Sequence, residues 1–276
     1  MNSLYSLYTR SFPDYPVSEA SFARITDKNA ELLTSFDREG NLIGFAVIRG
    51  SAVSLLCVAK DHRGCGVGSD LLARAEKHII SGGNKTITLG KGAGYIFQGV
   101  PEDHPEAVSF FRKRGYTADW TSVNMKLDLR SFDREKLMIP PCPADVTFRY
   151  AGEADRAELI RAVEIVDPNW LKYYTEPSSP VLLAVRNGAV AGFEIVSANK
   201  AKFHFDGETS GSIGCVGVLP SERRNGIGLR MAAEGLAELK KHGCTMSELI
   251  CVELADWYSR IGFKTMHRQW MGAKTI

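Results

Sequence analysis

The sequence predicts an α/β (α+β) protein made of two similar domains. Short apolar runs of strand length alternate along the chain with longer stretches of helical period. A unit of strand, glycine-bearing turn and helix occurs twice, and a proline-rich segment lies between the two copies. With 276 residues, 44% of them hydrophobic, the chain has enough apolar material for two modest cores.

The apolar patterns place the other elements around these two units. In the first half they predict helices over 1–12 and 18–27, strands over 31–36, 42–48, 53–59 and 86–89, and a short helix before Gly115. In the second half they predict strands over 146–150, 181–185, 190–197, 211–218 and 245–250, helices over 153–165 and 168–174, a short helix ending at Ile261, and a last strand from Phe263.

The domain boundaries follow from the proline-rich segment. We expect a first domain over 1–130, a linker over 131–144 and a second domain over 145–276, because three prolines within 140–143 stiffen the chain. The first domain lacks the strand that opens the second at 146–150. A bare sheet edge invites aggregation, so we expect chain from the other half, the tail after Trp270, to cover that edge.

The repeated turn has the chemistry of an anion site. It reads RGCGVG at 63–68 and RRNGIG at 223–228. Glycines let the backbone approach a ligand closely, and the first amides of the following helix have no partner within the helix. The helix dipole adds partial positive charge at that end. With arginines beside it, each turn is predicted to bind a pyrophosphate.

Two nucleotide-binding motifs do not fit these turns. A Walker loop needs Gly-Lys-Ser/Thr, which neither copy has, and a dinucleotide fingerprint needs a third glycine where Ser69 and Met231 stand. The pattern Arg-x-x-Gly-x-Gly resembles the pyrophosphate loop of the GNAT superfamily of acyl-CoA N-acyltransferases. This resemblance implies two tandem domains, each a mixed, mostly antiparallel sheet flanked by helices, and acetyl-CoA as cofactor.

The resemblance also implies which residues hold the cofactor. Gly217 lies within a strand, where glycine often marks a bulge that frees an amide to bind the thioester oxygen. The flanking strand residues are predicted to pair with the pantetheine arm. The predicted cofactor-binding residues are Val216, Gly217, Val218, Arg223, Arg224, Asn225, Gly226, Ile227 and Gly228, with Val58, Arg63, Gly64, Gly66, Val67 and Gly68 in the first half.

A phenol is the predicted general acid. In the family, a tyrosine stands four residues before the glycine that ends the short helix, and here that position holds Tyr258 in the second half and Phe111 in the first. A phenol stays protonated at neutral pH and can protonate a leaving thiolate, whereas phenylalanine cannot. We therefore expect the second domain to catalyse and the first to support it. Asp256 is our first choice as general base, and the alternatives are Glu253, Glu194, His204, Asp206 and Glu208.

The substrate is suggested by a narrower resemblance. The segments 94–101, 214–218, 256–258 and 270–272 resemble tandem acetyltransferases that act on glucosamine and glucosaminides in cell-wall sugar salvage. This implies acetylation of a primary amine on an amino sugar, with Trp257, Tyr95 and Glu194 as candidate substrate contacts. The loop over 90–105 is either a wall of the substrate site or a solvated surface loop. An acyltransferase for an antibiotic, polyamine or peptide, or a non-catalytic acyl-CoA sensor, remains an alternative.

The composition of the chain limits its expected partners and cellular location. The net charge of +2, with acidic and basic residues mixed, argues against a nucleic-acid partner. The six cysteines form no C-x-x-C pair, which predicts neither a metal site nor a disulfide framework and favours a reducing, cytoplasmic setting. The first residues are too polar for a signal peptide, and no apolar run is long enough to cross a membrane. The sequence does not indicate an oligomeric state.

Overall fold

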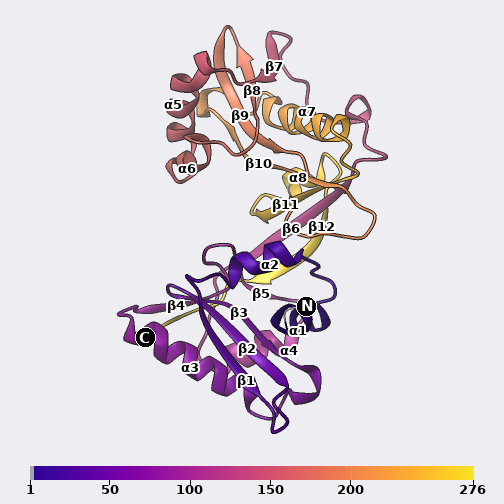
Figure 1. Cartoon of the computed structure of the whole chain (residues 1–276). Coiled ribbons are helices and arrows are strands. Elements are labelled where there is room, and N and C mark those ends of the chain that lie inside the picture. The colour runs from indigo at the N-terminus through magenta and orange to yellow at the C-terminus, as the bar shows by residue number, and fades with distance from the viewer. Residues whose placement is uncertain (1–2, 200) are drawn as a thin grey trace. The chain divides into compact units, whose positions relative to one another are not determined.

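The computed structural model describes residues 3–199 and 201–276 and confirms the predicted α/β architecture with two mixed sheets (Figure 1). The chain forms two compact units. Unit 1 consists of 1–123, 202–205 and 267–276, and unit 2 consists of 124–201 and 206–266. The units therefore do not coincide with two contiguous halves, because the tail and a short segment at 202–205 fold with the first.

Unit 1 contains the first glycine turn. Its elements are α1 (Ser3–Ser11), α2 (Glu19–Ile25), β1 (Glu31–Phe36), β2 (Leu42–Arg49), β3 (Ala52–Val58), η1 (Lys60–His62), α3 (Val67–Ser81), β4 (Thr86–Leu89), β5 (Val100–Pro101), α4 (Pro105–Arg112) and β13 (Ala273–Thr275). Ser18 caps the second helix, because its hydroxyl accepts from the Ser21 amide at 3.1 Å.

The sheet of unit 1 has the order β1-β2-β3-β4-β13. β3 and β4 are parallel and pair only through Ala52 with Thr88 and Val53 with Leu89, after which no further pair is registered between them in the described residues. Helix α3 lies along one face, where Leu72, Ala75 and Ile79 form part of a buried apolar cluster (Figure 1). The apolar residues of α3 thus form a stripe at helical spacing that faces the core.

The tail does not cover the edge that we expected. Residues 273–275 form β13, which pairs antiparallel with β4, at the side of the sheet opposite β1. β1 stays at the outer edge, with no further strand beside it among the described residues. The prediction that the tail covers the β1 edge of the sheet is therefore wrong. The backbone explains why: two residues after the end of β12 (Lys264–Trp270), the Gly272 carbonyl accepts from the Leu89 amide at 2.9 Å, which brings the tail beside β4.

Unit 2 contains the second glycine turn. Its elements are β7 (Val146–Tyr150), η3 (Glu153–Asp155), α5 (Arg156–Val166), η4 (Pro168–Trp170), α6 (Leu171–Tyr174), β8 (Val181–Arg186), β9 (Ala189–Ser197), β10 (Ser210–Val218), η5 (Pro220–Glu222), α7 (Ile227–Lys241), β11 (Met246–Val252) and α8 (Ala255–Ser259), with η2 (Arg134–Lys136) before them. The unit boundaries fall inside β6 (Thr121–Asp128) and β12.

The sheet of unit 2 repeats the arrangement of unit 1 and has the predicted opening strand. β7, β8, β9 and β10 are successively antiparallel, and β11 adds in parallel. Only the segment 210–212 of β10 pairs with 246–248 of β11. Helix α7 packs on one face and α5 on the other (Figure 1). In both units, therefore, a parallel strand pair separates just before the glycine turn.

The linker lies along helix α7 within unit 2. Arg134 forms an ion pair with Glu234, and Glu135 forms one with Arg230 at 3.3 Å. Further along, a Cβ at Gly226 would overlap the carbonyl oxygen of Pro141. The prolines therefore pass directly over the start of α7, a contact between distant parts of the chain that the sequence pattern does not reveal.

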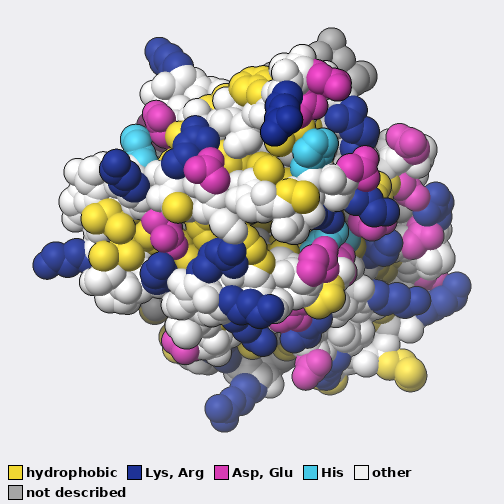
Figure 2. All heavy atoms as spheres, turned by 90° about the horizontal axis from the view of Figure 1, so that it is seen from below, with side chains coloured by type: hydrophobic (Ala, Val, Ile, Leu, Met, Phe, Trp, Pro, Cys, Tyr) yellow, Lys and Arg dark blue, Asp and Glu magenta, His cyan; other side chains and the backbone are white. Residues whose placement is uncertain are grey.

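Charges of both signs are mixed on the face of the molecule that Figure 2 shows. On the face in Figure 2, Lys and Arg side chains alternate with Asp and Glu side chains, in keeping with the net charge of +2. Within the described residues, no helix combines the length and apolar character needed to cross a bilayer.

Candidate active site

The two glycine turns have the same backbone geometry. Gly66 (φ 91°) and Gly226 (φ 75°) each stand in the left-handed region immediately before the first residue of a helix. The first arginine of each turn ties the turn to the end of the preceding strand. Arg63 donates from Nε to the Val58 carbonyl at 3.1 Å, and Arg223 donates to the Val218 carbonyl at 3.0 Å. The repeat in the sequence is thus a repeat in structure.

The surroundings of the two turns differ. Nothing lies within 4 Å of the position that a Cβ of Gly66 would take, whereas the linker occupies that position at Gly226. The last glycine of each turn faces an aromatic ring from the short helix: Phe110 lies 3.7 Å from a Cβ built on Gly68, and Trp257 lies 3.1 Å from one built on Gly228. Trp257 therefore borders the predicted cofactor loop, which does not support its predicted contact with the sugar.

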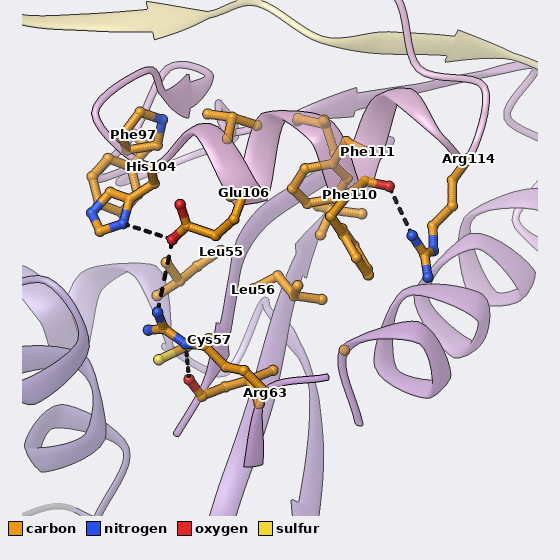
Figure 3. A pocket seen from close by; sticks show the side chains of 18 of the residues that line it. Leu55, Leu56, Cys57, Arg63, Phe97, His104, Glu106, Phe110, Phe111 and Arg114 are labelled. Carbon is orange, nitrogen blue, oxygen red and sulfur yellow. Dashed lines mark hydrogen bonds and ion pairs between the residues drawn. The ribbon is translucent and has the colours of Figure 1, made fainter. Parts of the chain in front are cut away.

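Unit 1 contains a cavity of about 470 Å³ where β3 and β4 separate. Its walls are mostly apolar and come from β3, the first glycine turn and α4 (Figure 3). The lining includes the predicted residues Val58, Arg63, Gly64, Gly66 and Gly68, together with Ser54, Leu55, Leu56, Cys57, Phe97, His104, Glu106, Phe110, Phe111 and Arg114. Val67 instead points toward β2, 3.0 Å from a Cβ built on Gly44.

Ionic side chains gather at the mouth of this cavity. Glu106 lies 3.9 Å from Arg63 and 3.5 Å from His104 Nδ1, and Figure 3 shows the three side chains converging. Arg114 lies 3.7 Å over the Phe110 ring and donates to the Ser69 hydroxyl at 2.6 Å. A cavity that is apolar inside and basic at its rim suits a ligand with an apolar arm and an anionic end.

A bulge also interrupts β3. Val47 of β2 pairs with Leu55, and Ile48 pairs with Val53, so Ser54 is an extra residue in the ladder. Its hydroxyl is buried, lines the cavity, and has no hydrogen-bond partner among the described residues. The segment from Ala52 to Val58 holds no glycine, so no residue in it marks the position of this bulge.

The first cavity has no phenol at the expected position. Phe111 lines it and is 6% exposed, packed edge-on against Tyr116 with ring centroids 5.6 Å apart. The cavity can therefore hold a ligand, but the position that supplies the proton in the family pattern carries a hydrocarbon ring. This is the chemical difference between the two units that the sequence predicts.

The predicted bulge in β10 is present. Gly214 pairs with Ile195 and Gly217 pairs with Phe193. The interval between the two pairs is therefore three residues on β10 and two residues on β9, so β10 has one extra residue. Cys215 adopts φ 49° at this point, a left-handed conformation that is strained for a residue with a side chain. Gly217 is required for packing as well, because a Cβ there would overlap the Phe193 ring.

Tyr258 lies on α8 in an apolar environment close to this bulge. Burial is the main cause that raises its pKa, and Glu194 and Cys215 raise it further. Its ring packs edge-on against Trp257, with centroids 4.7 Å apart. The phenol therefore stays protonated at neutral pH, the state that a general acid requires.

Two other predicted residues lie elsewhere. Asp256 is exposed in the first turn of α8. Residues two apart on a helix do not share a face, so the structure does not bring Asp256 and Tyr258 together. Glu194 is 0% exposed on β9, beneath α7, where only the absence of a side chain at Gly235 leaves it room. This enclosed position does not support Glu194 as a general base or as a substrate contact.

The loop over 90–105 is docked, which excludes the solvated alternative for most of it. Phe97 is 3% exposed and lines the first cavity. Tyr95, however, is held by Lys202, whose Nζ donates to the Tyr95 carbonyl at 2.7 Å and lies 3.3 Å over the ring. Tyr95 does not line the cavity. The first cavity is thus walled by Phe97 rather than by the predicted Tyr95.

Burial of Glu194 leads to a prediction about stability. Burial raises its pKa well above the ordinary 4.5, so the folded state holds the proton more tightly than the unfolded state. A raised pKa contributes stability that is complete below pH 4.5 and is lost as pH rises toward the folded-state pKa. Glu194→Gln should therefore raise the melting temperature at pH 8 and leave it nearly unchanged at pH 4.5.

Thermal melts of this variant across that pH range provide the check. The matched control is Glu253→Gln, which makes the same change at an exposed residue and should leave the difference between the two pH values as in the wild type. A Glu194→Gln protein that is less stable than wild type at pH 8 would show that the carboxylate is paired in the folded state.

Comparisons with known proteins agree with this geometry. A model of the acetyltransferase (GNAT) domain matches residues 8–127, and a model of the acetyltransferase (GNAT) family matches residues 149–263. The comparison with curated proteins found no match.

Solved structures share the fold over most of the chain. The chain is 25% identical to a fungal multi-domain β-N-acetylglucosaminidase described as having a GCN5-related glucosamine N-acetyltransferase region, with a TM-score of 0.83; the match covers 98% of this chain and about a third (36%) of that one. A GCN5-related N-acetyltransferase from Sphaerobacter thermophilus has 19% identity and a TM-score of 0.74, covering 99% and 91%. A tandem GNAT protein from the clavulanic acid pathway has 16% identity and a TM-score of 0.64, covering 90% and 84%.

Proposed function

We propose that this chain, which belongs to the GNAT family and carries two acetyltransferase domains in tandem, acetylates the amino group of glucosamine or a glucosaminide in its second domain. The coarser activity, N-acetyl transfer from acetyl-CoA, is that of the family. The observation that carries the assignment to the second domain is the placement of Tyr258 near the β10 bulge, whereas Phe111 stands at the matching position of the first.

The residues of the second domain account for the steps of acyl transfer. The turn from Arg223 to Gly228 offers helix-start amides and positive charge to the phosphates. The amine nitrogen attacks the thioester carbonyl, and the bulge amide stabilises the oxyanion that forms. As the carbon–sulfur bond breaks, the thiolate takes the proton of the Tyr258 hydroxyl, and the phenolate regains a proton from solvent before the next turnover. The proton released by the amine passes to solvent or to a carboxylate, for which Asp256 and Glu253 are both exposed candidates.

The amino-sugar substrate is supported by one relative. The fungal region described as a glucosamine N-acetyltransferase is similar over nearly the whole of this chain, at 25% identity. Thiol release from acetyl-CoA, measured with glucosamine and with a panel of polyamines, aminoglycosides and peptide amines, tests the proposal. Turnover that is highest with glucosamine supports the proposal. Turnover with only another amine would show that the reaction is correctly assigned but that the substrate is not glucosamine.

The first domain is proposed to hold acetyl-CoA without catalysing. Its cavity of about 470 Å³ has an apolar interior and a basic rim, and Phe111 denies it a general acid. The intact protein should therefore bind two molecules of coenzyme A. If no amine is acetylated although coenzyme A binds tightly, the chain is an acyl-CoA sensor instead.

Filling the first cavity separates the two sites. In Gly68→Leu, the new side chain extends toward Val58 and Phe110, which lie 3.6 and 3.7 Å from a Cβ at that position. Calorimetry should then detect one bound coenzyme A per chain instead of two, with thiol release persisting from the second domain. If thiol release disappears together with the first site, catalysis belongs to the first domain.

A further inference from the structure

A buried side chain donates a hydrogen bond to the backbone of the β10 bulge. Tyr174, at the end of α6, donates its hydroxyl hydrogen to the Cys215 carbonyl at 2.7 Å. Tyr174 is 2% exposed, and its ring packs edge-on against Phe193 with centroids 5.1 Å apart. Burial raises the pKa of the phenol, so it remains a donor over the whole neutral range.

Cys215, whose carbonyl accepts this hydrogen bond, has a strained backbone. Cys215 adopts φ 49°, and neither Cys215 nor Val216 has a registered partner on β9, since the ladder passes from Gly214 to Gly217. The pairing of β10 with β11 ends at Ser212. This peptide group therefore lies outside the regular register of the ladder, and a left-handed residue with a side chain persists only where its surroundings impose it.

The hydrogen bond to one side of a peptide group fixes its other side. In a trans peptide the carbonyl of one residue and the amide N–H of the next point in opposite directions. The peptide bonds of the described residues are trans. By holding the Cys215 carbonyl, Tyr174 therefore directs the Val216 N–H away from α6. Phe193, packed between Tyr174 and Gly217, fixes the other end of the bulge.

We propose that Tyr174 is a positioning residue for acyl transfer, which holds Cys215 in its left-handed conformation so that the Val216 amide points at the thioester oxygen. This inference rests on the proposed function of the second domain. Tyr174 itself does not touch the reacting atoms; it preorganises the donor that does, and a preorganised donor lowers the barrier without reorganising during the reaction.

The test replaces the hydroxyl alone. Tyr174→Phe should lower kcat about tenfold or more, because a misdirected oxyanion donor loses most of its effect. The Kd of coenzyme A should stay within about twofold of wild type, because the pyrophosphate turn is unchanged. The control is Tyr173→Phe, which removes a phenol from the neighbouring, 47% exposed residue of the same helix and should leave kcat unchanged.

A second substitution tests the mechanism of the effect. Glycine adopts positive φ without strain, so Cys215→Gly removes the need for the hydrogen bond. The loss caused by Tyr174→Phe should be much smaller in the Cys215→Gly background than in the wild type. An equal loss in both backgrounds would show that Tyr174 acts through general packing of α6, and would overturn the proposal.

A spectroscopic measurement does not depend on turnover. With acetyl-CoA carrying ¹³C in the thioester carbonyl, a hydrogen bond to the oxygen shifts the bound signal. Tyr174→Phe should move one bound signal toward its position in free acetyl-CoA and leave the signal from the first domain in place. Unmoved signals overturn the role of Tyr174 even if no amine substrate is found. A wild-type protein that acetylates no amine, with the signal moving as expected, instead contradicts only the proposed function.

Discussion

Replacing Tyr258 by phenylalanine lowers kcat on the order of 100-fold or more, because proton transfer by a positioned side chain contributes about that much to a rate. The variant loses one oxygen and keeps the ring that packs edge-on against Trp257 and Phe263. The fold and the affinity for coenzyme A should therefore be preserved. Steady-state thiol release with glucosamine, together with calorimetry, measures both quantities.

The control for this prediction is another tyrosine of unit 2. Tyr150 is 38% exposed on β7, and its hydroxyl lies 3.4 Å from Glu238. Tyr150→Phe removes the same atom away from the bulge and should leave kcat unchanged. A Tyr258→Phe protein with the wild-type kcat would remove the phenol from the mechanism and leave the leaving thiolate to be protonated by water.

The reverse substitution asks whether the first domain lacks only the phenol. Phe111→Tyr restores the family pattern in a cavity that already has a bulge at Ser54 and a formed glycine turn. Activity appearing in a Phe111→Tyr/Tyr258→Phe double variant would show that the two domains differ chiefly at this position. Continued inactivity would show that the first cavity cannot admit the amine.

Local features were predictable because the residues that determine them are adjacent in sequence. Both glycine turns, the helices that follow them and a bulge in β10 depend on local backbone requirements; the turns and helices are found where expected, and the bulge lies just before Gly217. The difference between Phe111 and Tyr258 is likewise visible in the sequence, since it needs only two aligned helix-to-strand turns.

Features that depend on distant contacts were not predictable. Alternation along β9 shows that Glu194 and its neighbours in sequence point to opposite faces of the sheet. Which of the two faces helix α7 covers depends on packing, and the contact between Gly235 and Glu194 shows that α7 covers the face with Glu194. The location of the tail was missed for the same reason, because β4 rather than β1 is the strand that β13 reaches. The positioning role of Tyr174 also needs the structure, since α6 and β10 are separated by two strands in sequence.

A substitution at the contact between the linker and the second glycine turn is also expected to lower turnover strongly. Gly226→Ala places a methyl group onto the Pro141 carbonyl at a residue with φ 75°. The left-handed conformation alone costs roughly 1–2 kcal/mol for alanine, and the overlap must be relieved by moving either the linker or the turn. Since displacement of about 1 Å can cost on the order of 100-fold in rate, we expect turnover to fall by that factor.

The first domain supplies a matched comparison for this variant. Gly66→Ala imposes the same left-handed strain, at φ 91°, but its methyl group meets nothing within 4 Å. The two variants therefore share the strain and differ in the steric overlap and in the domain affected. We expect Gly66→Ala to retain most of the thiol release and Gly226→Ala to lose it. If Gly66→Ala instead loses thiol release and Gly226→Ala keeps it, the first turn is the one that catalysis needs. That result would place catalysis in the first domain.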